Sequence, residues 1–248
     1  MHLTSQQRDH YKEQGFVVIP HLFSRATVTS MREHYMKRRA EGPKPGDSGG
    51  TTDHADDPNH QFPRMINMHN WDELTQEWAS DTNLITLTEQ LIDDTPVLLQ
   101  TMLYFKPPGA RGQALHQDEQ YITIDPIIGV WVALDTSDES VGRMVLIPRS
   151  HQNGLLSVET ADTAISFTNV QAAKPENAEE LGIDMSPGDT LFFDGKVIHG
   201  SYKNKTSDRW RRSFICHYMG ENSQRFEPAE GTHVSHLKKQ HKLEETDC

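Results

Sequence analysis

The sequence predicts an α+β, mainly β protein in which N-terminal helices pack on one sheet of an antiparallel double sheet. Two observations indicate this fold. Apolar residues recur at helical spacing as far as about residue 95, and beyond Pro96 they occur in short runs separated by turn residues. No repeat or linker divides the 248 residues, so we expect a single domain. Its parts would be a helical segment of about 1–95, a sheet core of about 96–220 and a polar, fraying tail of about 221–248.

Helix start and stop signals organise the first forty residues. Thr4 is a predicted N-cap for a polar helix that ends at Gly15. Residues 16–20 (FVVIP) follow as a short strand ended by proline. Ser24 is expected to cap a second helix, which spans about 25–39 and carries apolar residues on one face.

A loop and a third helical stretch follow. Residues 42–63 are rich in Gly, Pro, Asp and His, which predicts a long mobile loop. Long loops in compact domains are often functional, so this one is a candidate lid. Residues 64–67 (RMIN) are expected to form a short strand entering the site, and 72–91 to be mostly helical. The apolar face of this helical stretch would consist of Leu74, Trp78, Leu84, Leu87 and Leu91.

After Pro96 the pattern changes from helical to strand periods. Residues 97–106 (VLLQTMLYFK) alternate, which places Gln100, Met102, Tyr104 and Lys106 on one face of a strand. Short strands separated by turn residues at this spacing indicate a β-sandwich or barrel. The further strands are expected at 113–118, 129–134, 142–147, 154–158, 164–169, 190–193 and 213–219, with a polar insertion at 172–181.

The composition excludes several classes of function. The formal net charge of −12 argues against binding to nucleic-acid phosphates, which requires basic surface. Two cysteines, Cys216 and Cys248, cannot build a disulfide framework, so a cytoplasmic location fits best. No apolar run reaches membrane-spanning length, and the N-terminus lacks the apolar core of a signal peptide. We therefore expect a monomer or homodimer that acts on a small molecule, without nucleic-acid or membrane partners.

A possible metal site begins with His116-Gln117-Asp118. In an extended strand residues i and i+2 point to the same face, so His116 and Asp118 could reach one metal ion. A second histidine would complete the two-histidine, one-carboxylate triad of non-heme Fe(II) oxygenases. Because the chain has 14 histidines, one such triplet is expected by chance. His54-Ala55-Asp56 is a second one, and we interpret it as solvated loop because no strand precedes it.

His199 is the candidate for the missing ligand. A Pro187-Gly188-Asp189 turn starts an apolar strand, which delivers His199 beside the small pair Gly200-Ser201, where a ligand can approach closely. The alternative is a core histidine whose ring is satisfied by a backbone carbonyl.

Arg211 lies at the start of the strand that follows. A buried guanidinium needs an anion, and its planar fork suits the distal carboxylate of a co-substrate such as 2-oxoglutarate. A surface salt bridge is the alternative, and we prefer it for Arg209 and Arg212.

These motifs occur in an order that resembles the phytanoyl-CoA dioxygenase family of Fe(II)/2-oxoglutarate-dependent oxygenases. The order is His116-x-Asp118, the Trp131 strand, residues 145–151 (VLIPRSH), the turn at 187–189, and His199-Gly200-Ser201 followed by Arg211. The match runs from about Val97 to Tyr218, and residues 15–18 and 64–67 also resemble bacterial members. The resemblance implies a double-stranded β-helix (jelly-roll, cupin-like) core, with Fe(II), 2-oxoglutarate and O₂ as cofactors.

The resemblance also implies roles for individual residues. His116, Asp118 and His199 would hold the iron, and Arg211 would bind the far carboxylate of 2-oxoglutarate with Ser201 beside it. The family's arginine usually falls one residue closer to the distal histidine, so Arg212 is the second choice. Further co-substrate contacts would come from Gln100 and Tyr104, with Trp131 packed against the site and Met102 either in contact or in the core. His151 and His217 are expected to be structural.

The implied reaction is hydroxylation, or a similar oxidation, of a small molecule with release of succinate and CO₂. Related halogenases lack the carboxylate at the position of Asp118, so its presence favours hydroxylation. The candidate substrate contacts are Arg64, Asn67, Met68, Gln120 and Tyr121, with Arg64 either an anion anchor or a structural salt bridge. The sequence has no basic patch that would suit a CoA phosphate, which argues against the substrate that named the family.

Two other functions use the same fold. One is a non-catalytic metal- or ligand-binding sensor, which would have no need of the Arg211 clamp. The other is a cupin-type metal-dependent isomerase or hydrolase, which would work with Zn²⁺ or Mn²⁺ and without O₂.

Overall fold

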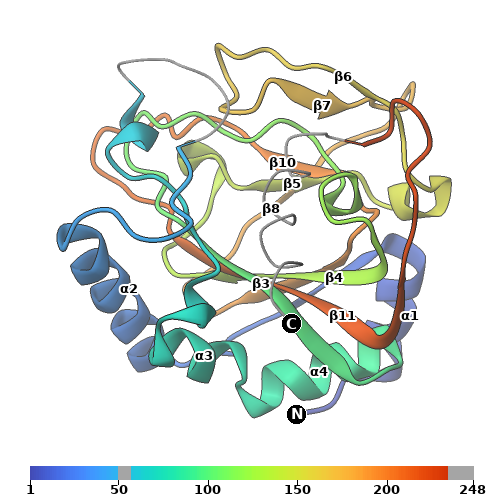
Figure 1. Ribbon diagram of the computed structural model, residues 1–248, viewed down its shortest axis with the longest axis horizontal. Coiled ribbons are helices and arrows are strands. Elements are labelled where there is room, and N and C mark those ends of the chain that lie inside the picture. The colour runs from blue at the N-terminus through green and yellow to red at the C-terminus, as the bar shows by residue number, and fades with distance from the viewer. Residues whose placement is uncertain (50–56, 234–248) are drawn as a thin grey trace, which may run out of the picture.

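The computed structural model describes residues 1–49 and 57–233, and it confirms the predicted α+β class with mostly antiparallel sheets. The helices are α1 (Ser5–Gln14), α2 (Arg25–Ala40), α3 (Glu73–Ala79) and α4 (Thr82–Ile92). The strands are β1 (Phe16–Ile19), β2 (Met65–Ile66), β3 (Pro96–Tyr104), β4 (Ile124–Ala133), β5 (Met144–Leu146), β6 (Val158–Thr160), β7 (Val170–Ala172), β8 (Leu181–Ile183), β9 (Thr190–Asp194), β10 (His199–Ser201) and β11 (Ser213–Arg225). Helices α2, α3 and α4 lie along one side of the long strands, and β5, β8 and β10 lie on the other (Figure 1).

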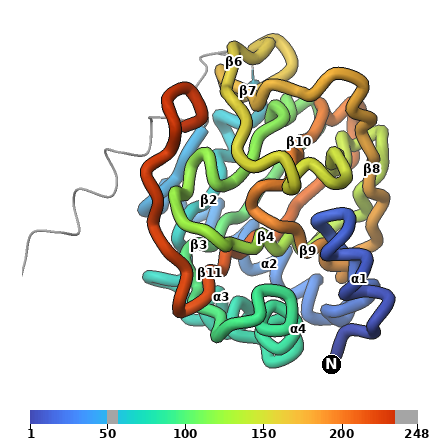
Figure 2. The backbone as a smooth tube through the Cα atoms, turned by 90° about the vertical axis from the view of Figure 1, so that its right-hand side faces the viewer, coloured from blue at the N-terminus to red at the C-terminus, as the bar shows by residue number. Residues whose placement is uncertain are grey.

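Two sheets form the core. The larger has the strand order β1-β9-β4-β11-β3-β2 and the smaller the order β10-β5-β8, and every pair of neighbours is antiparallel. Figure 2 shows the layers from the side, with α3 and α4 at the lower edge and the β6–β7 hairpin at the upper edge. This is the double-stranded β-helix arrangement that the sequence predicts.

The strand period of two divides the core into two layers. On β4, Val130 and Val132 pack toward the helices, whereas Trp131 packs toward the small sheet. On β11, Phe214 and Cys216 face the helices, and Ile215 faces the small sheet. The functional side chains described below belong to the layer between the two sheets.

Local signals set the N-terminal elements as predicted. Thr4 caps α1 through a capping box with Gln7, and Gly15 ends the helix with φ 85°. Ser24 caps α2 by accepting a hydrogen bond from Thr27 N. β1 pairs with β9 and so joins the N-terminus to the large sheet.

The third predicted helical stretch is two helices. α3 ends at Ala79, and Asp81 caps α4 by accepting hydrogen bonds from the backbone N–H groups of Asn83 and Leu84. The break changes the helical phase, so one apolar face cannot run through the whole stretch. The prediction that Leu74 belongs to that face is wrong, because its side chain is 41% exposed, whereas Trp78, Leu84 and Leu87 are buried.

A buried acidic residue connects α2 to the start of α3. Asp72 is 2% exposed and accepts hydrogen bonds from the Thr75 backbone N–H (3.0 Å) and hydroxyl (2.6 Å). His34 Nε2 lies 2.9 Å and Arg38 Nη2 3.1 Å from its carboxylate. We call Asp72, His34, Arg38 and Thr75 the Asp72 cluster.

Four predicted segments differ from the structure. Residues 113–118 form no strand: His116 makes an isolated bridge with His199, a bend lies at Leu115, and Asp118 begins a 3₁₀ turn. The strand predicted at 164–169 is wrong, because these residues form a turn and bends before β7. The strand predicted at 154–158 is also wrong, because β6 begins only at Val158. β11 continues to Arg225 by pairing with the start of β4, so a tail beginning at 221 is wrong.

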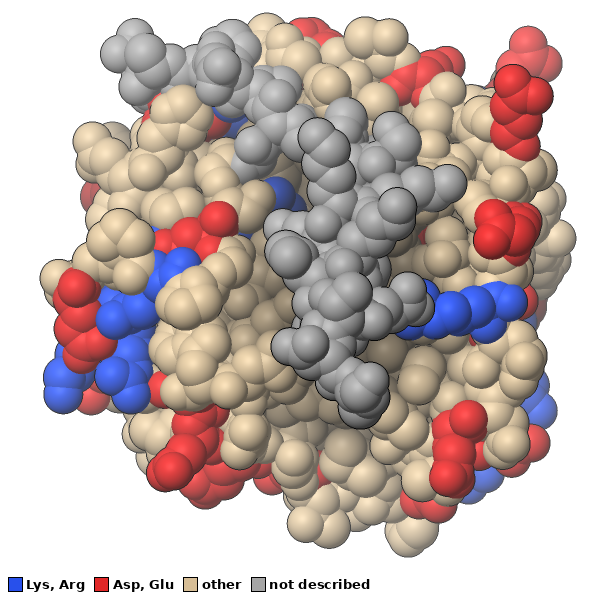
Figure 3. Space-filling view, in the orientation of Figure 1, with Lys and Arg blue, Asp and Glu red and all other residues tan. Residues whose placement is uncertain are grey.

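Other expectations concern the loop and the surface. In the described part of 42–63, Ser48 pairs with Arg64 through the backbone, while His54-Ala55-Asp56 lies outside the described residues, as do 234–248. Acidic and basic side chains are interspersed over the described part of the face in Figure 3. Among the described residues, no helix is both long enough and apolar enough to cross a membrane.

Candidate metal centre and co-substrate cavity

Two histidines and one carboxylate converge between the sheets. The backbones of His116 and His199 pair with each other through N–H···O distances of 2.8 and 2.9 Å, which places their rings side by side. Asp118 follows at the start of a 3₁₀ turn, and its Oδ1 lies 3.5 Å from His116 Nε2 and 3.6 Å from His199 Nε2. The three side chains are buried, and one ligand atom from each lies within 4.8 Å of the others.

The outer nitrogen of each histidine is fixed by the backbone. His116 Nδ1 donates to Ala114 O at 2.9 Å, and His199 Nδ1 donates to Val197 O at 3.0 Å. Metal-binding histidines usually donate their second nitrogen in this way, which leaves the Nε2 lone pair for the ion. His199 therefore has the carbonyl contact of a core histidine and also an Nε2 directed at Asp118.

His217 on β11 holds the carboxylate. Its Nε2 donates to Asp118 Oδ2 at 2.9 Å, and its ring is 2% exposed. The sequence predicted a structural role for His217, and in the structure His217 orients the Asp118 carboxylate. A hydrogen bond to one oxygen leaves the other, Oδ1, directed toward the two histidines.

The electrostatics of the three groups suit a divalent cation. Burial and the neighbouring His116 lower the pKa of His199 to about 4, so its ring is neutral near pH 7. Burial alone would raise the pKa of Asp118, but His199 and His217 outweigh it and hold that pKa well below its ordinary value. A neutral imidazole at His199 and an ionised carboxylate at Asp118 are protonation states that metal binding requires.

The donor set fits Fe(II). Two imidazole nitrogens and one carboxylate are the donors of the facial triad, which would leave positions on Fe(II) for other ligands. The lone pair of His116 Nε2 faces the cavity, where it accepts a hydrogen bond from Gln113 Nε2 at 3.0 Å.

A cavity adjoins the three side chains. Its wall comes from both sheets, and the lining residues besides the triad are Met102, Tyr104, Gln113, Trp131, Met144, Phe193, Gly200, Ser201, Arg211, Ile215 and His217. Of the predicted co-substrate contacts, Tyr104, Trp131, Ser201 and Arg211 are among them. Gln100 is not, although it lies on the same strand as Met102.

Arg211 is the arginine that reaches the cavity. It is 1% exposed, its guanidinium lies 5.3 Å from the centre of the Trp131 ring, and its Nη1 donates to Gly142 O at 3.4 Å. Arg212 points away and binds both oxygens of Asp135, at 2.7 and 2.9 Å. The salt bridge expected for Arg212 is therefore present, and Arg209 likewise pairs with Asp138. Burial lowers the pKa of Arg211 to about 10, which still leaves it charged near pH 7.

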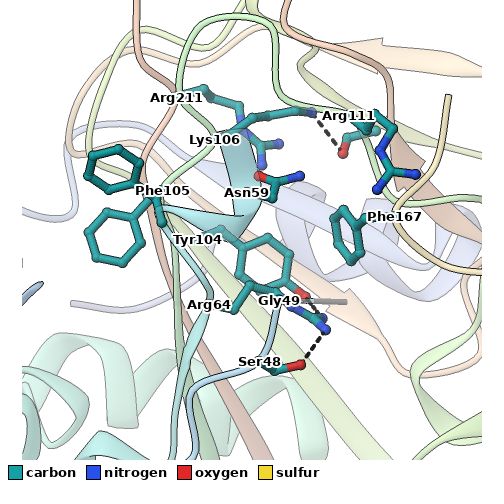
Figure 4. Close-up of a pocket in the computed structure, with 12 residues that line it drawn as sticks. Ser48, Gly49, Asn59, Arg64, Tyr104, Phe105, Lys106, Arg111, Phe167 and Arg211 are labelled. Atoms are coloured by element: carbon teal, nitrogen blue, oxygen red, sulfur yellow. Dashed lines mark hydrogen bonds between the residues drawn. The ribbon is translucent and has the colours of Figure 1, made fainter. Parts of the chain in front are cut away.

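A second cavity continues from Arg211, Ser201 and Tyr104 toward the described ends of the 42–63 loop (Figure 4). Arg64 lies in its wall, where its Nη1 donates to the Tyr104 hydroxyl at 3.1 Å and its guanidinium lies 4.7 Å from the centre of the Phe167 ring. Ser48, Asn59 and Phe62 line the same cavity, so both described ends of the loop reach it.

The other predicted substrate contacts divide into two groups. The Tyr121 ring lies 5.6 Å from the His116 ring, and its buried hydroxyl has no partner in the described chain. Asn67, with φ 56°, precedes a 3₁₀ turn, and its buried Oδ1 also lacks a described partner.

Met68 and Gln120 are wrong as substrate contacts. Met68 is 0% exposed and belongs to the core beneath the helices. Gln120 is also 0% exposed and is held by Gln117 and the Leu156 carbonyl. Both were expected at the site because of their position in the sequence, after Asn67 and after Asp118, but both lie in 3₁₀ turns that direct their side chains into the core.

Sequence reasoning missed two polar residues of the site. Gln113 connects the Tyr104 hydroxyl (3.0 Å) to His116, and Lys106 lines the second cavity with its Nζ 3.0 Å from Ser201 Oγ. A signal for Lys106 was present, because the alternation in 97–106 places it on the face of Met102 and Tyr104.

Known proteins are similar to this chain in sequence and in fold. The family model described as phytanoyl-CoA dioxygenase matches residues 11–213. The peroxisomal phytanoyl-CoA dioxygenase of Bos taurus is 26% identical over 254 residues, which cover 96% of this chain and 74% of that protein. A phytanoyl-CoA dioxygenase of Arabidopsis thaliana is 30% identical over 156 residues, which cover 61% of this chain and 54% of that protein.

Solved structures are similar at lower identity. EvdO2 from Micromonospora carbonacea var. aurantiaca has a TM-score of 0.74 at 17% identity, with 94% of this chain and 97% of that chain covered. Its complex with 2-oxoglutarate has a TM-score of 0.72. The epimerase SnoN, solved with Fe³⁺, alpha ketoglutarate and nogalamycin RO, has a TM-score of 0.72 at 17% identity, with 92% and 91% covered. At these identities the likeness shows a common fold.

Proposed function

The chain belongs to the phytanoyl-CoA dioxygenase family, and we propose that it is an Fe(II)- and 2-oxoglutarate-dependent dioxygenase that hydroxylates a small molecule. One observation carries the proposal. A buried His116, Asp118, His199 set and a buried Arg211 without a carboxylate partner in the described chain line the same cavity. A metal-binding triad and an anion-binding arginine are the two parts that a chelating keto acid with a distal carboxylate requires.

Each cofactor has residues that would hold it. His116, Asp118 and His199 would bind Fe(II), and Arg211 and Ser201 would bind the distal carboxylate of 2-oxoglutarate. When bound, iron and 2-oxoglutarate supply the activation of O₂, with oxidative decarboxylation to succinate and CO₂ and oxidation of a substrate C–H bond.

The protein's own contribution is positioning and exclusion of water. His217 orients Asp118 through its 2.9 Å hydrogen bond, and Trp131 covers one face of the Arg211 guanidinium. Met102, Phe193 and Ile215 give the cavity apolar walls, which strengthen the electrostatic contacts inside it.

Hydroxylation of a small molecule is the specific outcome that we propose. The carboxylate of Asp118 is present, and Arg64 and Tyr121 offer polar groups near the site for a substrate. The net charge of −12 does not favour a CoA ester.

The sensor and the O₂-independent isomerase or hydrolase are the competing functions. Neither of them needs a buried arginine in the metal cavity, because neither uses a dicarboxylic co-substrate. Arg211 therefore favours the oxygenase.

Anaerobic titration of the purified protein with Fe(II) and 2-oxoglutarate tests the proposal. We expect the weak visible charge-transfer band of the chelate and, on addition of O₂, formation of succinate. Absence of the band and of succinate would rule out the oxygenase. His199→Ala should remove both signals, whereas the exposed His2→Ala is a matched control that should keep them.

A further inference from the structure

Lys106 is a buried cation that the roles assigned so far do not use. It follows β3, is 4% exposed and lies in the wall of the second cavity together with Arg211 (Figure 4). Its Nζ donates to Gly142 O at 2.9 Å and to Ser201 Oγ at 3.0 Å. Arg211 Nη1 donates to the same Gly142 carbonyl, so the two cationic side chains are neighbours.

This pair of cations has only neutral partners. In the described chain neither Lys106 nor Arg211 has a carboxylate oxygen within 4.0 Å, and Arg211 Nε is buried without an acceptor. Arg111, in the same cavity, shows the contrast, because its Nε contacts the buried Asp57 carboxylate at 2.5 Å. Two adjacent buried cations without an anion are unfavourable, so the arrangement is one that an incoming anion stabilises.

The pKa shifts are in agreement with this geometry. Burial, followed by the neighbouring Arg211, lowers the pKa of Lys106 well below its ordinary value. Burial also lowers the pKa of Arg211. A carboxylate between the two groups would oppose both shifts, because an opposite charge favours the protonated forms.

Lys106 has a strained backbone conformation. Its φ is 31°, which lies in the region that residues with a Cβ rarely adopt. Its carbonyl accepts hydrogen bonds from Arg211 N at 3.1 Å and from Asn204 Nδ2 at 3.3 Å. The strained residue is therefore fixed to the backbone of the arginine with which it shares the cavity.

Ser201 is oriented by the same lysine. Its Oγ accepts hydrogen bonds from Lys106 Nζ and, at 3.4 Å, from the backbone N–H of Gln113. With both lone pairs used, the hydroxyl hydrogen remains available to donate to a ligand.

We propose that Lys106 is the second cation of a two-cation clamp that binds the distal carboxylate of the co-substrate together with Arg211 and the Ser201 hydroxyl. The inference rests on the proposed function and deepens it, because it assigns the selection of an anionic distal group to two side chains. A keto acid whose distal group is neutral would leave both cations unpaired and would bind weakly.

The test compares 2-oxoglutarate with its 5-amide, 2-oxoglutaramate, which has the same chelating end and a neutral distal end. Calorimetric titrations use the full chain loaded with Mn(II), so that no turnover occurs. We expect Lys106→Met to weaken binding of 2-oxoglutarate by ~30-fold or more, which is the effect of truncating one partner of a buried charge pair. Binding of the amide should be unchanged, so the variant loses the preference for the acid.

The acid and the amide together distinguish a clamp from a structural role for Lys106. Equal loss of affinity for acid and amide would show a structural role, and unchanged affinity for the acid would show no role; either result overturns the inference. Failure of the wild-type protein to bind 2-oxoglutarate would instead reject the proposed function. Lys37→Met, an exposed lysine on α2, is the matched control. Should Lys106→Met not fold, Lys106→Gln keeps a donor for Gly142 O and Ser201 Oγ, and the same comparison applies.

Discussion

The Asp72 cluster and the cavity at Lys106 and Arg211 both bury charged side chains, but only the cluster pairs its charges within the described chain. In the Asp72 cluster the carboxylate is surrounded by His34, Arg38 and Thr75, so its hydrogen-bonding capacity is met by the chain. In the cavity, Lys106 and Arg211 have only a carbonyl and a hydroxyl. A charge that serves the fold is paired within the chain, whereas a charge that serves a ligand has a partner only when the ligand is bound.

The comparison predicts the largest effect for Arg211→Met. We expect the affinity for 2-oxoglutarate to fall by about 30-fold to several thousandfold, because truncating one partner of a buried charge pair costs ~2–5 kcal/mol. The free energy of unfolding of the ligand-free protein should not fall, because an unpaired buried charge is replaced by an apolar group of similar length. Titration calorimetry and urea unfolding measure the two quantities.

The neighbouring Arg212→Met is the control, with the opposite pattern. Its loss leaves Asp135 with Arg32 alone, at 3.3 Å, so stability should fall while affinity for 2-oxoglutarate is retained. If Arg211→Met destabilises the ligand-free protein as much as Arg212→Met does, the distinction between the two regions fails.

Asp72→Ala should affect stability alone. Removing the carboxylate leaves His34 without its ion-pair partner, leaves the half-exposed Arg38 with Glu41 alone and removes the cap of α3, so we expect a loss of ~2–4 kcal/mol from the cap and the charge-assisted hydrogen bonds together. Urea unfolding measures the loss, and the exposed Asp9→Ala is the control. A large change in the dissociation constant of 2-oxoglutarate would show that the cluster is coupled to the site.

The pH dependence of stability tests whether the Asp72 carboxylate is paired within the chain. Burial raises the pKa of Asp72, but the hydrogen bonds from Thr75 and His34 outweigh it, and the net pKa is lowered below 3.8. The folded state therefore binds fewer protons than the unfolded state, so this stabilisation is present above the unfolded pKa and is lost as pH falls through the folded pKa. Asp72→Asn should remove this part of the acid dependence in a urea series from pH 6 to pH 3. A slope identical to that of the wild type would contradict the assignment.

The smallest effect is expected from glutarate, a dicarboxylate without the keto group. At ten times its Kd it should stabilise the wild-type protein by about 1.4 kcal/mol, because only the folded state holds the clamp. Thermal unfolding should show the same increment in Asp72→Ala, from a lower baseline, and none in Arg211→Met. An increment in Arg211→Met equal to that of the wild type would place the dicarboxylate elsewhere.

Much of the fold followed from local patterns. Caps at Thr4 and Ser24, the stop at Gly15 and the alternation in β3 depend on residues close in sequence, and the structure agrees with each. The error at Leu74 assumed that one helical period continued through a segment where a helix break changes the direction of the side chains. Met68 and Gln120 were expected at the site because they lie close in sequence to Asn67 and Asp118, and 3₁₀ turns direct both side chains into the core.

By itself the sequence determined which residues are available for the site. These are His116-x-Asp118, a later His199 and an arginine after it, in an order similar to that of one family. Only the tertiary structure decided which groups meet. Lys106 and Ser201 are 95 residues apart, and Asp118 and His217 are 99 apart, yet each pair forms a hydrogen bond. Strand register sets such contacts, and register depends on the whole sheet. For the same reason the choice of Arg211 over Arg212 followed from the burial of one side chain and the Asp135 partner of the other.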